Sequence, residues 1–267
     1  MTERAVAIGL FGLGEAGTPI ATDLVNAGAN LKAYDPAPVT TPEGVIRVDR
    51  PQAVVDSVDL VMAITSAASS QKVLEQVLHN IAPNAVYADL ATAAPGLEVR
   101  LAASAASVGI PFADVALMAP VPGRGLAVPS LASGAGAARY AQLINGLGGQ
   151  VEAIGDEAGH ASARKLMRSI VTKGLSALLI ESMALASARN DSEWLWDHLV
   201  AELGSMSEEF MARLLTGPAN HAERRIEEME AAQEMLAESG LEAPMTRATV
   251  ERLRLVLAAG VPDLPTV

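Results

Sequence analysis

Short apolar runs alternate with helical stretches over the first 156 residues of the chain. Residues 5–11 form one such run, almost continuously apolar until it stops at glycines, as in a strand buried on both faces of a parallel sheet. Further predicted strands lie at 31–34, 60–64, 85–87, 111–115, 128–132 and 150–153, with helices at 15–27, 70–79, 96–106 and 137–147. This alternation predicts an α/β domain over 1–156, built on a Rossmann-type, doubly wound parallel sheet.

The pattern changes after Gly159. No proline and a single glycine, Gly174, interrupt residues 161–188, so we expect one long helix of roughly 28 residues, about 42 Å in length. The remaining segments, 194–206, 208–215, 220–239 and 244–257, are helical in pattern, with breaks at Gly217-Pro218 and Gly240. The sequence thus predicts a second, all-helical domain over 157–267, which the long helix joins to the first.

A glycine-rich turn follows the first predicted strand and opens the first predicted helix. Gly12, Gly14 and Gly17 have the Gly-x-Gly-x-x-Gly spacing of dinucleotide-binding turns. Asp35 ends the second strand 18 residues after Gly17, where a carboxylate accepts hydrogen bonds from the adenosine ribose hydroxyls. This carboxylate would repel a 2′-phosphate, and no arginine follows it at once, so NAD is favoured over NADP. Because methyltransferases hold S-adenosylmethionine with a similar turn, the turn by itself leaves that alternative open.

Two hydroxyl side chains follow the strand predicted at 60–64. Thr65 and Ser66 therefore lie at the carboxyl edge of the predicted sheet, where such turns approach the ribose and nicotinamide of a cofactor. A plain strand-ending turn or helix N-cap is the equally weighted alternative.

The composition narrows the chemistry. The 267 residues have a net charge of -12 and no cysteine, which removes disulfides, thiolate metal sites and cysteine nucleophiles and fits a cytoplasmic location. The four histidines show no metal-ligand spacing, so no metal is expected. The acidic balance disfavours nucleic acid as a partner. Charged residues interrupt both apolar stretches that approach the ~20 residues of a membrane helix, so no membrane segment is expected.

Four segments carry the motifs of one family. Residues 8–21 contain the glycine turn and Pro19; residues 89–95 read Asp-Leu-Ala-Thr-Ala-Ala-Pro; residues 114–123 read Asp-Val-Ala-Leu-Met-Ala-Pro-Val-Pro-Gly; and residues 159–169 read Gly-His-Ala-Ser-Ala-Arg-Lys-Leu-Met-Arg-Ser. In these segments the chain resembles the β-hydroxyacid dehydrogenases, the short relatives of 6-phosphogluconate dehydrogenase. The resemblance implies that Thr92 lies near the nicotinamide ribose. The residues expected to bind the cofactor are Gly12, Leu13, Gly14, Glu15, Ala16, Gly17, Asp35, Thr65, Ser66 and Thr92.

The loop expected to bind substrate departs from the family pattern. Where the family has a Ser-Gly-Gly turn that grips the substrate carboxylate, this chain has Met118, Ala119, Pro120 and Val121, and the change removes the hydroxyl and one N–H. A divergent branch of 6-phosphogluconate dehydrogenase-like NAD-binding proteins is similar in its Met-Ala-Pro-Val-Pro run. We therefore widen the expected substrates from 3-hydroxy acids to hydroxyl or carbonyl compounds with an apolar or aromatic portion.

Lys165 takes the position of the family's catalytic lysine, and Ser169 stands where the family has an asparagine that positions substrate. The resemblance implies that Lys165 is the general acid or base of the reaction. Lys173, about two turns along the same helix, is the rival. Glu227 is a further departure, because it replaces a lysine that in relatives faces the nicotinamide region.

We therefore expect an NAD-dependent oxidoreductase that moves a hydride between the nicotinamide and a small hydroxyl or carbonyl substrate, with a homodimer built on the helical domain. Two alternatives stay open: an imine reductase acting on C=N bonds, and a dinucleotide-binding sensor without turnover. The methyltransferase alternative falls behind, because a long helix carrying a lysine and an all-helical tail are not what that reaction needs.

Overall fold

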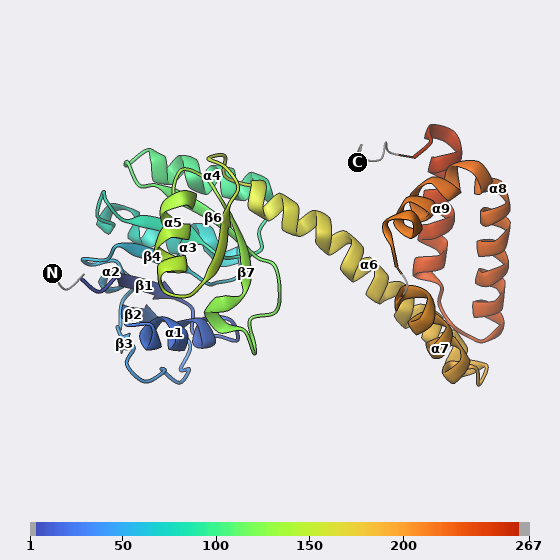
Figure 1. Cartoon of the computed structure of the whole chain (residues 1–267), viewed down its shortest axis with the longest axis horizontal. Helices are drawn as coiled ribbons and strands as arrows, with labels where there is room; N and C mark the ends of the chain where they lie inside the picture. Colours follow the sequence, from blue (N-terminus) through green and yellow to red (C-terminus); the bar gives the residue numbers. More distant parts are fainter. Residues whose placement is uncertain (1–3, 205, 262–267) are drawn as a thin grey trace. The chain divides into compact units, whose positions relative to one another are not determined.

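The chain divides into two compact units, Met1–Ser169 and Ile170–Val267, of which the computed structural model describes residues 4–204 and 206–261 (Figure 1). The division falls inside helix α6 (His160–Ala188). This helix confirms the long helix expected over 161–188. The boundary expected between residues 156 and 157 lies just before α6, whereas the compact units divide within it.

The first unit contains a single sheet with the strand order β3-β2-β1-β4-β5-β6-β7-β8 within the described residues. The strands are β1 (Ala7–Phe11), β2 (Asn30–Tyr34), β3 (Ile46–Arg47), β4 (Leu60–Ala63), β5 (Val86–Asp89), β6 (Phe112–Leu117), β7 (Pro129–Ser133) and β8 (Gln150–Ala153). Neighbouring strands are parallel except for the antiparallel pair β6 and β7. The predicted Rossmann-type sheet is confirmed, with this one pair reversed because a loop and the 3-10 turn η2 (Gly125–Ala127) replace a crossover helix.

Helices cover both faces of the sheet. On one face, α1 (Gly17–Asn26) and α5 (Ala137–Gly146) pack on Ile8, Leu60 and their neighbours. On the other face, α2 (Pro51–Val54), α3 (Ala67–Val77), the 3-10 turn η1 (Leu78–Asn80) and α4 (Pro95–Ala106) surround Phe11, Tyr87 and Phe112. The sequence pattern predicts neither β3 nor α2, because elements of two and four residues are too short to show a period.

The first turn of α6 is fixed to the sheet by one carboxylate. Asp114 in β6 accepts hydrogen bonds from the Gly159 N–H (3.0 Å), the Ser162 N–H (3.1 Å), the Ser162 hydroxyl (2.5 Å) and the Ser133 hydroxyl (3.0 Å). The Ser133 hydroxyl in turn accepts from the Ala161 N–H (3.0 Å). An anion at a helix N-terminus satisfies free N–H groups and complements the helix dipole. This cap holds the beginning of α6 against the ends of β6 and β7.

The second unit is helical, as expected. It contains the end of α6, α7 (Ser192–Gly204), α8 (Glu208–Glu238) and α9 (Pro244–Ala259). The break expected at Gly217-Pro218 is a kink inside α8 rather than an end: Pro218 lies within the helix and His221 has the non-helical angles φ -139° and ψ 28°. Glu181 of α6 caps α9 by accepting hydrogen bonds from the N–H groups of Met245 and Thr246, both at 2.8 Å.

Helix α6 is long and apolar enough, by length and composition alone, to be a candidate membrane span among the described helices, with a mean hydropathy of 1.4 over its best window. That measure tolerates the charged residues Lys173 and Glu181, which interrupt the stretch. Glu181 accepts hydrogen bonds from α9, and the absence of a membrane segment stays a prediction.

Candidate active site

The glycine turn after β1 leaves room for a phosphate group. A Cβ on Gly12, whose φ is +95°, would lie 2.1 Å from the carbonyl oxygen of Ile64, and a Cβ on Gly17 would lie 2.0 Å from that of Gly12. A Cβ on Gly14 would meet no described atom within 4 Å. No side chain in the described residues caps α1. The free N–H groups and positive dipole end of α1 therefore adjoin open space at Gly14, as pyrophosphate binding requires.

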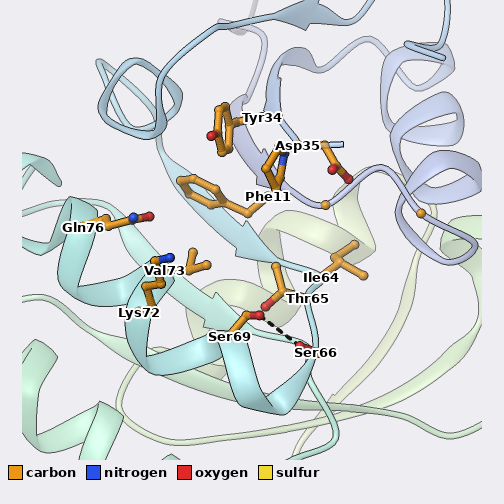
Figure 2. Close-up of a pocket in the computed structure, with 13 residues that line it drawn as sticks. Phe11, Tyr34, Asp35, Ile64, Thr65, Ser66, Ser69, Lys72, Val73 and Gln76 are labelled. Atoms are coloured by element: carbon orange, nitrogen blue, oxygen red, sulfur yellow. Dashed lines mark hydrogen bonds between the residues drawn. The ribbon is translucent and has the colours of Figure 1, made fainter. Parts of the chain in front are cut away.

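A cavity of about 400 Å³ lies against this turn (Figure 2). It opens at the carboxyl ends of β1, β2 and β4 and is closed on one side by α3. The lining residues are Phe11, Gly12, Gly14, Tyr34, Asp35, Pro36, Ile64, Thr65, Ser66, Ser69, Lys72, Val73 and Gln76. The structure thus brings together five residues that were expected to bind the cofactor: Gly12, Gly14, Asp35, Thr65 and Ser66.

Backbone N–H groups hold the Asp35 carboxylate in place. Its Oδ2 accepts a hydrogen bond from Leu13 N–H at 2.7 Å and its Oδ1 accepts one from Ala37 N–H at 2.8 Å. Each carboxylate oxygen can accept more than one hydrogen bond, so both remain able to accept from hydroxyl groups in the cavity. Asp35 thus lines the cavity, and its role as a ribose-binding carboxylate stays a prediction.

Arg47 of β3 fixes the loop that follows Asp35. Its guanidinium donates to the carbonyl oxygens of Val39 (2.5 Å), Asp35 (2.8 Å) and Ala37 (2.6 Å). Carbonyl groups thereby use the donors that an arginine would need to bind a phosphate. The sequence analysis missed Arg47, because its only signal is an arginine in a predicted loop.

The two hydroxyl residues after β4 differ in their contacts. Thr65 Oγ1 is buried and has no hydrogen-bond partner in the described part of the chain, although Thr65 lines the cavity. Ser66 precedes α3, but its side chain makes no capping hydrogen bond there and instead lies 3.0 Å from the Ser69 hydroxyl. Ser66 thus occupies the N-cap position of α3, as the alternative expected, but without a capping hydrogen bond from its side chain. A buried hydroxyl without a partner is costly unless a ligand satisfies it, which fits a cofactor at this position.

Two further walls of the cavity were not predicted. Phe11 and Tyr34 come from the sheet and pack edge to face, with ring centroids 6.3 Å apart. Figure 2 shows Lys72, Val73 and Gln76 facing the cavity from α3. An apolar cleft of this kind suits an adenine ring. The sequence does contain a signal for two of these residues. Phe11 and Tyr34 are the last residues of β1 and β2, and each directly precedes an expected cofactor residue, Gly12 or Asp35.

The other expected residues lie outside this lining. Thr92 is exposed in the turn between β5 and α4. Residues 118–121 follow β6, and the Met118 carbonyl accepts a hydrogen bond from Arg168 Nη1 at 2.6 Å. Lys165 and Ser169 lie on α6 within one turn of Arg168 and are half-buried. The first unit thus brings the start of α6 to the expected substrate loop, while the catalytic roles of Lys165 and Ser169 stay predictions.

Buried acids lie beneath the carboxyl edge of β5 and were not predicted. Burial raises the pKa of Glu98 from 4.5 to about 9, and the charges of Asp89 and Asp114 add to the rise. Burial also raises the pKa of Asp89, to about 6, against hydrogen bonds from Ala91 N–H and Ser70. Both Glu98 carboxyl oxygens and the Tyr87 hydroxyl lack partners among the described residues. Glu98 is therefore a neutral acid at pH 7.

The chain matches two family models, which together run through both units. Residues 7–130 match the NAD binding domain of 6-phosphogluconate dehydrogenase, and residues 186–256 match a domain of unknown function (DUF1932). The uncharacterized oxidoreductase YfjR of Bacillus subtilis (strain 168) is 28% identical over 193 residues, covering 67% of this chain and 66% of that protein. The match thus spans just under two thirds of that relative.

Solved structures match over almost the whole chain. A conserved hypothetical protein from Sinorhizobium meliloti 1021 is 29% identical, with a TM-score of 0.61 over 99% of this chain and 92% of that one. A reductive aminase from Aspergillus terreus, in complex with NADPH4, cyclohexanone and allyl amine, is 20% identical, with a TM-score of 0.80 over 96% and 95%. An imine reductase from Myxococcus stipitatus, in complex with NADP+, is 17% identical, with a TM-score of 0.82 over 96% and 95%.

The sheet, the glycine turn and the adjoining cavity define a dinucleotide-binding domain, and the match of residues 7–130 makes the dinucleotide a nicotinamide one. The pairing of matched domains then identifies the family. The chain belongs to the nicotinamide-dinucleotide-binding oxidoreductases related to 6-phosphogluconate dehydrogenase, whose NAD binding domain it pairs with a DUF1932 domain. The described residues hold no cluster of three or more metal-ligating side chains, and the expected lack of a metal stays a prediction.

Proposed function

We propose that the protein is an NAD-dependent oxidoreductase that transfers a hydride between the nicotinamide and a small hydroxyl or carbonyl substrate. One observation carries the proposal: the cavity joins an open glycine turn, a fixed carboxylate and the buried, unpartnered hydroxyl of Thr65. Bound NAD would supply or accept the hydride. The remaining work, which is orientation and proton transfer, belongs to the chain.

Lys165 is proposed as the proton donor and acceptor. In reduction its Nζ gives a proton to the substrate oxygen as hydride adds to the carbon; in oxidation it removes the hydroxyl proton. Its position is supported by two contacts of the first unit. Asp114 binds the backbone N–H groups six and three residues before Lys165, and Arg168 donates a hydrogen bond from the next turn to the Met118 carbonyl. Residues on such an anchored helix keep a defined orientation toward the loop at 118–121.

Substitution of Lys165 by methionine tests this role. We expect Lys165→Met to bind NADH as the wild type does and to lose turnover, and the matched Lys173→Met to keep turnover. The readouts are NADH fluorescence for binding and NADH absorbance for turnover. An active Lys165→Met protein would refute the assignment. If all variants bind NADH and no substrate class is turned over, the non-catalytic sensor is favoured.

A C=N substrate is the second candidate, and a specific observation favours it. The solved structures with TM-scores of 0.80 and 0.82 are described as a reductive aminase and an imine reductase. Against this, a lysine stands at the proposed proton-donor position, which favours C–O chemistry by its resemblance to the hydroxyacid dehydrogenases. A panel of ketones, 3-oxo acids and cyclic imines, assayed by NADH oxidation, separates the two by which class is reduced.

NAD rather than NADP is the proposed cofactor. The Asp35 carboxylate would repel a 2′-phosphate, and carbonyl oxygens hold the nearby Arg47 guanidinium. The cation that lines the described cavity is Lys72, so a preference for NADP would have to depend on it. We expect NADPH to bind at least tenfold more weakly than NADH, since an unpaired charge contact costs about 1.5 kcal/mol or more. Equal affinities of the wild type for NADH and NADPH would contradict the preference. If Lys72→Gln then lost affinity for NADPH alone, Lys72 would be the residue that binds the 2′-phosphate.

We also propose that the protein is a homodimer. Large apolar side chains of α6 are exposed in the single chain: Ile170 by 75%, Val171 by 63% and Ile180 by 71%. Large apolar side chains exposed along one helix are typical of an interface between subunits. Light scattering after size-exclusion chromatography tests this. A monomeric wild type would overturn the proposal, and Ile170→Glu is expected to shift the dimer towards monomer.

A further inference from the structure

A second cavity, of about 570 Å³, lies within the helical unit and shares no residue with the cofactor cavity. Its walls are α8 and α9, which run side by side in Figure 1. Helix α9 contributes Met245, Thr249 and Arg252, which follow one another at intervals of four and three residues and so share one face of the helix. Helix α8 contributes Arg225 and Met229 at an interval of four. The cavity is thus the space between two matched helix faces.

Part of the lining of this cavity is apolar. Leu178 of α6, Met229 of α8, and Met245 and Leu253 of α9 contribute to it, and Leu253 is buried. A cavity of several hundred Å³ with apolar lining residues is of the size and character that binds small organic molecules. These side chains therefore suit a hydrocarbon or aromatic group.

The charged part of the lining is mainly basic, in a chain whose net charge is -12. Three guanidinium groups, those of Arg224, Arg225 and Arg252, line it together with one carboxylate, Glu228. Arg224 forms an ion pair with Glu228 at 2.7 Å, which leaves two arginines in excess. Arg225 and Arg252 have no ion pair within the residues that the structure describes. Unpaired like charges repel each other, so stability of the helices does not account for them.

The kink in α8 makes room for one of these arginines. A Cβ on Gly217 would lie 2.7 Å from Arg225 Nη2, so the guanidinium occupies the space that a larger residue would take. Arg225 is half-buried in this position. A partly desolvated guanidinium interacts more strongly with an anion than a fully solvated one does, and its planar fork matches a carboxylate.

We propose that this cavity binds a small organic anion, with a carboxylate on Arg225 and Arg252 and an apolar body against Leu178, Met229 and Leu253. The apolar lining residues distinguish this ligand from inorganic phosphate, and the excess positive charge distinguishes it from a neutral apolar molecule. The proposal uses no residue of the cofactor cavity and stands whether or not the oxidoreductase assignment is correct.

Calorimetric titration of the full-length protein tests the site. The probes are phenylacetate, its neutral analogue phenylacetamide and inorganic phosphate. We expect phenylacetate to bind at least tenfold more tightly than the other two, since a hydrogen bond to a charged group contributes about 1.5 kcal/mol or more. Arg225→Gln and Arg252→Gln should each weaken phenylacetate by about tenfold. The control is Arg254→Gln, because Arg254 is also on α9 but pairs with Glu230 outside the cavity.

A further variant separates a binding role from a structural one. Glu228→Gln removes the negative charge of the cavity and frees Arg224, so it should tighten phenylacetate binding, whereas damage to the helices would weaken it. Equal affinities for phenylacetate and phenylacetamide, tighter binding of phosphate, no binding of phenylacetate, or equal losses in the Arg254→Gln control would each overturn the proposal.

Discussion

The neutral state of Glu98 makes the stability of the first unit depend on pH. Burial raises the pKa of Glu98 from 4.5 to about 9 in the folded protein. The folded protein holds the Glu98 proton more tightly than the unfolded chain does. This contribution to the free energy of unfolding is fully present below about 4.5, the pKa of Glu98 in the unfolded chain, and is lost as the pH rises towards about 9, its pKa in the folded protein. Each pH unit between them lowers the free energy of unfolding by about 1.4 kcal/mol. From about pH 5 to about pH 8 the loss is about 4 kcal/mol.

Glu98→Gln removes this proton uptake while it keeps the size and neutrality of the side chain. The variant should lose most of the pH dependence and be more stable than the wild type by about 4 kcal/mol at about pH 8. Asp89, whose pKa is also raised, to about 6, leaves a smaller slope below about pH 6 in both proteins. Glu75→Gln, at an exposed position of α3, is the matched control and should behave as the wild type.

The distribution of aromatic residues makes the assay specific to one unit. Every tyrosine of the sequence lies in the first unit and both tryptophans lie in the second: Tyr34, Tyr87 and Tyr140, against Trp194 and Trp196. Urea unfolding followed by tyrosine second-derivative absorbance therefore reports the first unit, and selectively excited tryptophan fluorescence reports the second. The Glu98 effect should appear in the tyrosine signal alone. A pH slope that is equal in wild type and Glu98→Gln would refute the reasoning.

Three further predictions follow from local geometry. Gly14→Val should abolish NADH binding in a fluorescence titration with no change in thermal stability, whereas Gly12→Ala should lower the stability itself, because its Cβ would lie 2.1 Å from a carbonyl oxygen. Arg47→Lys should weaken NADH binding about tenfold, because the loop after Asp35 loses the hydrogen bonds that the guanidinium donates to its carbonyl oxygens. An unchanged dissociation constant for NADH would exclude this positioning role. Glu181→Ala should lower the tryptophan-reported unfolding free energy by about 1–3 kcal/mol, because two N–H groups at the start of α9 lose their acceptor; an effect on the tyrosine signal instead would count against the cap.

Features that depend on neighbouring residues could be predicted from the sequence. The glycine turn, Asp35 and the long helix α6 are each encoded within a short segment, and the structure has all three. The direction of a strand within the sheet and the continuity of a helix through a proline are not encoded in a short segment. An apolar run such as that of β7 reads the same in a parallel and an antiparallel strand, and Pro218 reads as a helix end unless packing of α8 on α9 is known.

The missed site residues depend on contacts between elements. Glu98 occupies the first turn of α4, where an acid ordinarily faces solvent and complements the helix dipole. Only the packing of α4 on the sheet places it beside Asp89 and beneath the surface. Arg47 likewise holds the loop after Asp35 only because β3 pairs with β2, which brings the guanidinium within hydrogen-bond distance of that loop.

The buried acids connect the first unit's stability to the helix that carries Lys165. Asp114 accepts three hydrogen bonds from Gly159 and Ser162 at the start of α6 and a fourth from Ser133 of β7, and this role requires carboxyl oxygens that are free to accept. Its charge is also one cause of the raised pKa of Glu98. If Glu98 were ionised as well, its charge would oppose that of Asp114 in a region without solvent. The proton on Glu98 therefore keeps a second negative charge away from Asp114, the residue that anchors the start of α6, and no motif of the sequence marks this acid.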